Sequence, residues 1–200
     1  NKGYSLHSLE KYEEAIACYD EAIQLDPEDV DAWSNKGQVL DKIRKYSEAI
    51  ACYDEAIQLD PENYDAWFKK AMILCILERQ EEAIPCFDEA TRINPESFGA
   101  WYVKGSTLGM LKRFEESLTC LNEATWINPD NTDVWNIKGT ILFEMNRFED
   151  DIACYDESLR LDPENITPSL LHNKGRALKK LGRDEEAENC FKKAKELAES

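Results

Sequence analysis

Cysteine is the residue type in this 200-residue sequence whose number and spacing could most readily support chemistry. Six of the seven cysteines recur at intervals of 34 residues, except for a last interval of 36, and Cys75 lies outside the series. Thiols repeated in this way could hold a row of zinc ions or form disulfides, although the sequence has no Cys-x-x-Cys pair, the commonest zinc-binding spacing. The six are Cys18, Cys52, Cys86, Cys120, Cys154 and Cys190.

The distance between equivalent positions in neighbouring structural repeats argues against both roles. Packed helices lie roughly 10 Å apart, whereas a disulfide needs Cα atoms within about 7 Å and zinc needs sulfur atoms at about 2.3 Å. We therefore predict that the cysteines are reduced packing groups inside the fold, in a reducing compartment. No metal and no cofactor is expected.

A lysine also recurs once in every repeat. One interpretation is a ladder of cations for an acidic ligand. We favour another, in which the aliphatic stems pack along the helices and the ammonium groups reach neighbouring carboxylates. The series is Lys2, Lys36, Lys70, Lys104, Lys138 and Lys174.

The remaining titratable residues do not predict catalysis. The two histidines, His7 and His172, are far apart in the sequence, so a His-containing triad cannot be assembled from it. Carboxylate pairs such as Asp20-Glu21 and Asp54-Glu55 fit a solvated helix face. The chain has neither a Gly-rich phosphate loop nor a dinucleotide fingerprint. We predict that it is not an enzyme.

The elements that position these residues follow from a 34-residue period in several independent columns. A small-residue column (Gly37, Ala71, Gly105, Gly139) and an aromatic column (Tyr53, Phe87, Tyr155) keep the same phase. The two most regular columns are proline and tryptophan: Pro27, Pro61, Pro95, Pro129 and Pro163, with Trp33, Trp67, Trp101 and Trp135.

Each period predicts two amphipathic helices, exemplified by Asp31–Ile43 and Ser47–Leu59, because apolar residues recur at three- and four-residue spacing. Acidic residues in the first turn of the second helix suit the positive end of the helix dipole. The Asp-Pro or Asn-Pro pair then ends that helix. Such a hairpin cannot bury its apolar face alone, so successive hairpins must stack.

This pattern resembles the tetratricopeptide repeat, most clearly in Trp33–Gly37–Leu40–Tyr46–Ala49–Tyr53–Ala56–Pro61. The resemblance implies an all-α, right-handed solenoid superhelix of antiparallel helix-turn-helix hairpins. It covers the chain as a single array over residues 1–200, with repeats 1–29 (partial), 30–63, 64–97, 98–131, 132–165 and 168–200. For function it implies binding of other proteins rather than a particular pathway.

The two ends depart from the pattern. The first repeat lacks the opening of its first helix, and the sixth has Leu171 in place of tryptophan and Asp184 in place of the corner aromatic. Two residues are inserted near Ile166-Thr167, which is expected to change the local angle between the last two repeats. Without an initiator methionine, the chain is expected to be part of a longer protein.

In this family the first helix of each repeat lines an inner groove that receives a peptide or a short helix. We predict an apolar, aromatic and Met-bearing stretch with a cationic end as the partner-binding surface. The alternative is that some of these side chains belong to the core. The candidate residues are Phe68, Met72, Ile76, Tyr102, Met110, Ile137, Phe143 and Arg176.

The chaperone-adaptor branch of the family holds acidic peptide tails with a clamp of Lys, Asn and Arg. None of the three registers that start at the second, third and fourth repeats reproduces it here. Starting from the second repeat, the clamp positions hold Ser34, Gln38, Lys69, Gly99 and Val103. An adaptor of this carboxylate-tail type is therefore not expected.

Charge restricts the partners further. The chain has 41 acidic and 24 basic residues, a net charge of −17, which disfavours nucleic acid and anionic membranes. The longest uncharged apolar run, Ala71–Leu77, is too short to span a bilayer. The chain opens without a secretory signal, and we expect a cytoplasmic location.

We therefore predict a non-catalytic scaffold that binds a peptide or helix of a partner protein in the groove. Two alternatives remain open at this point. In the first, the chain is a non-catalytic module of a larger enzyme or of a secretion or assembly machine. In the second, it is a structural unit that assembles end to end. Weak homo-association through exposed terminal repeats is expected, because Lys174–Ser200 is net positive and the rest is acidic.

Overall fold

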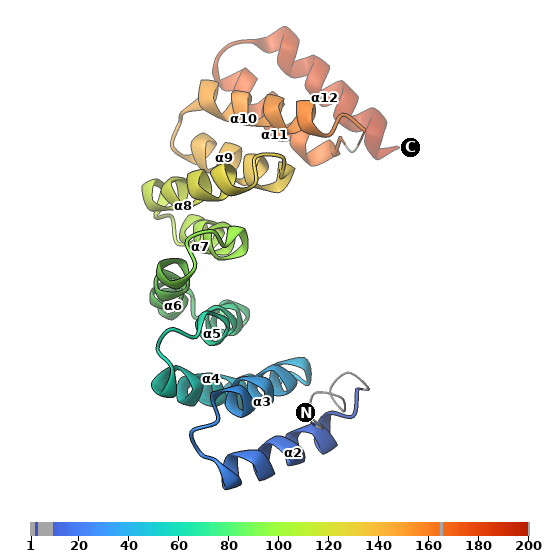
Figure 1. Ribbon diagram of the computed structural model, residues 1–200. Helices are drawn as coiled ribbons and strands as arrows, with labels where there is room; N and C mark the ends of the chain where they lie inside the picture. The colour runs from blue at the N-terminus through green and yellow to red at the C-terminus, as the bar shows by residue number, and fades with distance from the viewer. Residues whose placement is uncertain (1–2, 4–9, 165, 200) are drawn as a thin grey trace. The chain divides into compact units, whose positions relative to one another are not determined.

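The computed structural model describes residues 3, 10–164 and 166–199, and every regular element in this part of the chain is a helix. Figure 1 labels these helices in chain order. They are α2 (Tyr12–Leu25), α3 (Val30–Lys42), α4 (Tyr46–Leu59), α5 (Tyr64–Ile76), α6 (Gln80–Ile93), α7 (Phe98–Met110), α8 (Phe114–Ile127), α9 (Thr132–Glu144), α10 (Phe148–Leu161), α11 (Pro168–Lys180) and α12 (Asp184–Ala198).

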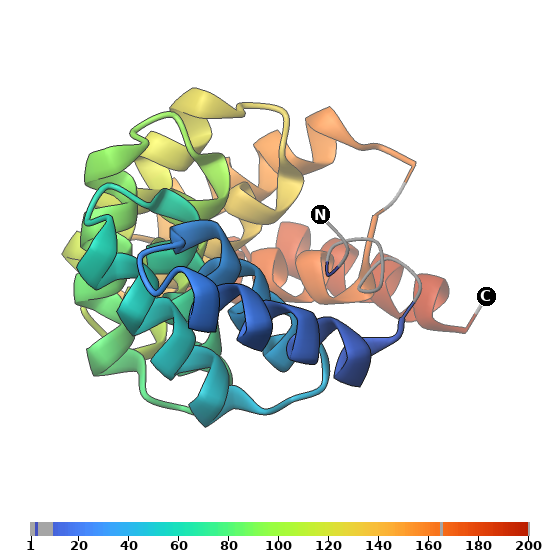
Figure 2. The ribbon, with the colours of Figure 1, turned by 60° about the horizontal axis from the view of Figure 1, so that its bottom comes forward.

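The helices divide between two compact units, an N-terminal unit (Asn1–Glu96) and a C-terminal unit (Ser97–Ser200). In the N-terminal unit α3 packs on α4 and α5 on α6, and α2 and α4 join them by packing on α3 and α5. In the C-terminal unit the pairs are α7–α8, α9–α10 and α11–α12, joined through α8–α9 and α10–α11. Figures 1 and 2 show the two helices of a pair side by side. These hairpins confirm the predicted all-α, tetratricopeptide-type architecture.

Side-chain caps explain where the first helix of each repeat begins. A polar side chain at the N-cap accepts a hydrogen bond from the backbone N–H three residues later, which satisfies a donor that the helix itself leaves unpaired. Asp29 accepts from the N–H of Ala32 at 2.9 Å, and Asn63 accepts from that of Ala66 at 3.0 Å. The inserted Thr167 does the same for α11 at 3.2 Å, directly before Pro168. The remaining caps of this type are Ser97 and Asn131.

The turn between the two helices of a hairpin uses a left-handed backbone conformation. Arg44, Glu78, Lys112 and Asn146 have φ between 58° and 60°, and Gly182 has φ 73°. In each turn the chain closes on the preceding helix, as where Lys45 N–H donates to the Leu40 carbonyl at 2.9 Å. This geometry ends one helix and starts the next within three residues.

The proline and tryptophan columns work together at the end of each repeat. The residue before the proline, such as Asp60, leaves helical geometry. The next tryptophan then donates its indole N–H to the proline carbonyl, at 3.1 Å from Trp33, 3.0 Å from Trp67 and 2.9 Å from Trp135. Trp33, Trp67 and Trp135 therefore each fix the connection to the repeat that precedes them.

Close packing of a small residue against an aromatic ring explains the other two columns. A Cβ atom added to Gly37 would lie 2.9 Å from the Tyr53 ring, and one added to Gly139 would lie 2.9 Å from the Tyr155 ring. Tyr53 and Phe87 are 1% and 0% exposed. A side chain in the small-residue column would therefore separate the two helices of the hairpin.

The predicted helix limits were wrong by one residue. The expected Asp31–Ile43 is Val30–Lys42 and the expected Ser47–Leu59 is Tyr46–Leu59, because the Asp29 cap and the turn at Arg44 set the starts. His7, Lys2 and the opening of the first repeat lie outside the described residues. None of the described helices is both long and apolar enough to cross a membrane. A single right-handed array over all six repeats stays a prediction.

Candidate partner-binding face

The cysteines are buried or half-buried, as expected of packing residues. Cys52, Cys86, Cys120 and Cys154 are 4–5% exposed, and Cys18, Cys75 and Cys190 are half-buried. Burial raises the pKa of the Cys52 and Cys154 thiols to about 11, so both are protonated at neutral pH. None of the seven, all of which are described, is in a disulfide. Neutral buried thiols are poor nucleophiles and poor metal ligands.

Three of the repeated lysines form ion pairs with carboxylates of this chain. Lys36 lies 2.6 Å from the carboxylate of Asp20, and Lys70 lies 2.5 Å from that of Asp54. Lys174 pairs with Asp156 in the same way. In every case a first helix is tied to the second helix of the preceding repeat. These three lysines therefore favour the structural interpretation over a ladder of ligand-binding cations.

In the N-terminal unit the three candidate residues lie on α5. Phe68 is half-buried, stacked on Tyr64 at 5.7 Å between ring centroids and packed edge-on against Phe87 at 6.1 Å. Met72 is half-buried, whereas Ile76 is 54% exposed. The aromatic member is thus partly a core residue, and the exposed apolar surface lies toward the C-terminal end of α5.

In the C-terminal unit the face of α7 carries Tyr102 and Met110. The Tyr102 ring stacks on Phe98 with centroids 5.6 Å apart. Burial, with a smaller contribution from Asp133 on α9, raises the pKa of Tyr102. Met110 is 63% exposed and offers a flexible apolar surface.

Phe143 on α9 and Arg176 on α11 come together. The guanidinium carbon of Arg176 lies 4.4 Å from the centroid of the Phe143 ring, and the ring also packs edge-on against Phe148 at 5.4 Å. Ile137, also on α9, is half-buried against the core that includes Leu142. The sequence named Phe143 and Arg176 separately, and the structure makes them one cation–π pair.

This pair forms the wall of a cavity of about 430 Å³ between α9, α11 and α12. Within the described residues, no carboxylate lies within ion-pair distance of its three cations. Positive charge in a net acidic chain is thus concentrated beside two aromatic rings. The cavity is lined by Phe143, Arg176, Lys179, Lys180 and Phe191.

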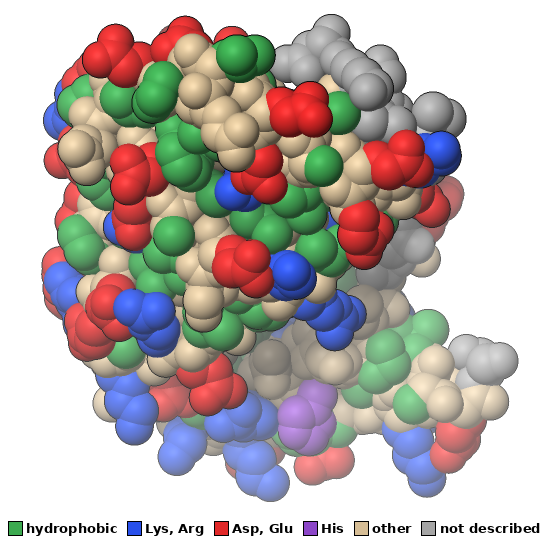
Figure 3. All heavy atoms as spheres, turned by 90° about the horizontal axis from the view of Figure 1, so that it is seen from below, with side chains coloured by type: hydrophobic (Ala, Val, Ile, Leu, Met, Phe, Trp, Pro, Cys, Tyr) green, Lys and Arg blue, Asp and Glu red, His purple; other side chains and the backbone are tan. Residues whose placement is uncertain are grey.

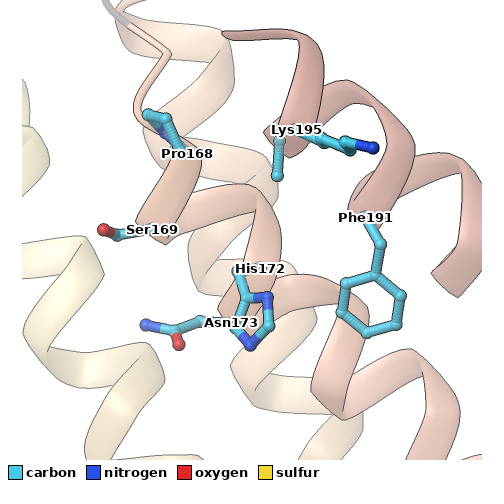
Figure 4. Close-up of a pocket in the computed structure, with 7 residues that line it drawn as sticks. Pro168, Ser169, His172, Asn173, Phe191 and Lys195 are labelled. Carbon is cyan, nitrogen blue, oxygen red and sulfur yellow. The ribbon is translucent and has the colours of Figure 1, made fainter. Parts of the chain in front are cut away.

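A second cavity of about 420 Å³ lies on the other side of Phe191, shown in Figure 4. The rings of His172 on α11 and Phe191 on α12 are in contact, with centroids 5.3 Å apart and planes tilted by 50°. His172 is exposed. Figure 3 shows a histidine side chain, in purple, at the surface beside blue lysine and arginine side chains. The lining residues are Pro168, Ser169, His172, Asn173, Phe191, Ala194 and Lys195.

Phe191 lines both cavities, and the sequence analysis did not name it as a site residue. It lies on a second helix, whereas the predicted groove used only first helices. A signal was present, because Phe191 occupies the aromatic column in which Tyr53 and Phe87 are almost fully buried. In the last hairpin the same ring is only half-buried.

Beneath this face lies Asp151 of α10, a carboxylate in a column that otherwise holds alanine or serine. It is 0% exposed, and neither oxygen accepts a hydrogen bond in the described part of the chain. Burial raises the pKa of Asp151 to about 7, although the positive charge of Arg176 and the nearby Tyr155 hydroxyl both lower it. The equivalent Ser117 instead donates a 2.6 Å hydrogen bond to the Gly105 carbonyl.

Comparison with solved structures gives the same architecture. YrrB, described as a TPR protein with an unusual peptide-binding site, is 23% identical, with a TM-score of 0.80 over 88% of this chain and 90% of that one. MamA from Desulfovibrio magneticus RS-1 is 20% identical, with a TM-score of 0.78 over 85% and 95%. These likenesses show the fold alone.

At the level of sequence, no curated protein matches the chain with significant similarity. A family model does match, over residues 8–200, and its description is cilia and flagella-associated protein 70 C-terminal domain. The chain therefore belongs to this family and is a tetratricopeptide-repeat protein, a protein-interaction module by fold.

Proposed function

We propose that the C-terminal unit is a non-catalytic scaffold that binds an acidic peptide segment of a partner protein, anchored by an aromatic or aliphatic side chain. The observation that carries the proposal is the 430 Å³ cavity, in which two phenylalanine rings adjoin the cations Arg176, Lys179 and Lys180. Apolar rings receive the anchor, and the cations attract flanking carboxylates.

The neighbouring surface extends the same chemistry. Tyr102, Met110 and Ile137 provide apolar contacts along α7 and α9, next to hydroxyls that already have backbone partners. Ser106 donates to the Tyr102 carbonyl at 2.9 Å, and Thr140 donates to the Asn136 carbonyl at 3.1 Å. A ligand can therefore cover these hydroxyls without leaving their donors unpaired.

The description of YrrB as a peptide-binding TPR protein is consistent with this mode of action. In the N-terminal unit Phe68, Met72 and Ile76 form a separate apolar surface, and we treat it as a second segment of the same kind of interface. Weak homo-association through the terminal repeats stays a prediction, for which Leu25 on α2, 89% exposed, and Leu197 on α12, 37% exposed, are accessible apolar groups.

Fluorescence anisotropy with a labelled peptide of sequence Glu-Glu-Phe-Glu-Glu tests the proposal. We expect it to bind more tightly than Glu-Glu-Ala-Glu-Glu, which lacks the anchor, and than Lys-Lys-Phe-Lys-Lys, which reverses the charge. Equal affinity for all three peptides, or binding that persists in the double variant Phe143→Ala, Arg176→Ala, would refute it.

A further inference from the structure

One lysine of the repeated series lacks the carboxylate that its counterparts use. Counting back 16 residues from Lys36 and Lys70 reaches Asp20 and Asp54, their ion-pair partners. The same count from Lys138 on α9 reaches Asn122 on α8. An amide oxygen carries no net charge, so this position cannot neutralise the ammonium group.

The position of the Lys138 side chain reflects this loss. Its ammonium nitrogen lies 4.5 Å from the centroid of the Trp135 ring, whereas the paired Lys36 and Lys70 lie 5.6 and 5.8 Å from theirs. No described carboxylate forms an ion pair with it. Burial lowers the pKa of Lys138, and the nearby Cys154 thiol, which is protonated at neutral pH, adds no negative charge to offset it. Lys138 is a half-buried cation whose main electrostatic partner is an aromatic face.

A cavity of about 350 Å³ opens beside this cation, on the side of α8 and α10. Asn122 and Thr119 add polar groups, and the aliphatic part of the wall comes from Leu118, Leu142 and Ala153. Two acidic residues also line it: Asp150 is held by Arg147 at 2.7 Å, and Glu115 is exposed to solvent. The arrangement is a cation at the end of an apolar wall.

The N-terminal unit contains the matched cavity with its lysine already paired. There Lys36, Leu40, Ala51 and Cys52 take the places of Lys138, Leu142, Ala153 and Cys154, in a cavity of about 290 Å³. Asp20 neutralises the ammonium of Lys36. The two cavities thus differ in whether the protein itself supplies the carboxylate.

We propose that the cavity at Lys138 binds a short-chain carboxylate, which completes from outside the ion pair that Asn122 cannot form. The carboxylate meets the ammonium of Lys138, with the Asn122 amide N–H as a second donor at the same wall. Two or three methylene groups lie against Leu118, Leu142 and Ala153. This chemistry is shared by a free aliphatic acid and by the glutamate side chain of a partner protein.

The site is separate from the proposed peptide-binding face, because it is built from α8, α9 and α10 on the side of the second helices. Its test therefore relies on variants of Lys138 and Asn122, which do not line the cavity at Phe143 and Arg176. Phe143, Arg176 and Phe191 do not line it.

Nuclear magnetic resonance of the intact chain tests the site with butyrate as the probe. We expect saturable shifts of the Lys138 ε-methylene and the Trp135 indole N–H, because the ammonium leaves the ring for the carboxylate. Butylammonium and sodium chloride should not produce them, and Lys36 with Trp33 serves as the internal control. N-acetylglutamate N-methylamide, run in parallel, distinguishes a free acid from a protein side chain by which of the two binds more tightly.

The decisive variant is Asn122→Asp, which places the missing carboxylate inside the protein. We expect it to weaken butyrate binding by about tenfold or more, while Asn122→Ala retains binding to the ammonium. Lys138→Met should abolish it, and its unchanged spectrum elsewhere shows that the unit stays folded. Shifts that do not saturate with either probe, equal shifts with chloride, or undiminished binding in Asn122→Asp would overturn the proposal.

Discussion

The guanidinium carbon of Arg176 lies 4.4 Å above the ring of Phe143, so one face of that ring is covered by a cation of the next repeat. Such a pair contributes roughly 0.5–1 kcal/mol at an exposed site. It also holds the guanidinium at the wall of the cavity, where a free side chain would sample many rotamers. A ligand therefore meets a preorganised cation beside an apolar ring edge rather than two independent side chains.

Replacing either member of this pair should weaken binding of the Glu-Glu-Phe-Glu-Glu peptide. We expect losses of about 1–3 kcal/mol for Phe143→Ala and for Arg176→Ala, the range of anchor residues. The losses should be less than additive, because each change also removes the contact that positions the other residue. Anisotropy titrations of the two single variants and the double variant measure this.

Lys192→Ala is the matched control, since it removes one cation from the same unit at a side chain that is 78% exposed and lines neither cavity. It should bind as the unmodified chain does. Added salt should weaken the peptide complex, because exposed charges are screened over about 8–10 Å at moderate ionic strength. An Arg176→Ala variant that binds as well as Lys192→Ala would contradict the assigned role of the pair.

Asp151 makes a prediction about stability and pH. Its pKa is about 7 in the folded chain against an ordinary value of 3.8, so the folded state binds the proton more tightly than the unfolded state. A raised pKa gives a stabilising contribution that is complete below about pH 4 and is lost as the pH rises toward 7. Asp151→Ser removes this pH-dependent loss. Its hydroxyl can donate a hydrogen bond to a backbone carbonyl, as the hydroxyl of Ser117 does.

We therefore expect Asp151→Ser to be more stable than the unmodified chain above pH 7, by an amount on the order of 4 kcal/mol at most. The difference should shrink steadily between about pH 7 and pH 4. Urea unfolding at several pH values measures it, and Asp151→Asn separates the charge from the polar group. A difference that does not change with pH would show that Asp151 does not titrate in this range.

The thiols predict an order of chemical labelling. With a pKa of about 11, Cys52 and Cys154 are thiolate in only about one molecule in a thousand at pH 8. Iodoacetamide should therefore modify the half-buried Cys18 and Cys190 well before Cys52 and Cys154. Peptide mass spectrometry after timed quenching gives the order. Seven thiols should react in the denatured, unreduced chain, and a smaller number would mean that some are oxidised.

The hairpin architecture could be predicted from the sequence because the signals are local and repeated. The residue before Pro61 cannot stay helical, so a helix must end there. The small residue Gly37 allows close packing of the two helices, and the aromatic Tyr53 recurs in phase with it. The ion pairs of Lys36 and Lys70 were also foreseen in kind, as ammonium groups reaching nearby carboxylates. The start of the first helix expected at Asp31–Ile43 was missed by one residue because the capping role of Asp29 was not recognised.

The site was harder to foresee because it depends on contacts between repeats. The candidate set named Phe143 and Arg176 but not their stacking, which follows from how α11 packs next to α9. Phe191 was left out because the aromatic column is core in the other hairpins. The sequence analysis did not single out Asp151. Its repeat column, which otherwise holds alanine or serine, was the signal in the sequence, and the structure adds that the side chain is 0% exposed.

Asn122→Asp should stabilise the chain, because it restores a pair that the fold already uses elsewhere. Lys138 is half-buried and its pKa is lowered by burial, so a carboxylate at this position would relieve an existing cost. In the equivalent pair Lys174 is 18% and Asp156 is 54% exposed, an environment between surface and core. We expect a gain of about 0.5–1.5 kcal/mol in the free energy of unfolding.

Urea denaturation measures it, and a double-mutant cycle with Lys138→Met isolates the pair. The gain should vanish in the Lys138→Met background and diminish at high salt, whereas an equal gain with and without Lys138 would mean that the new carboxylate acts through some other contact.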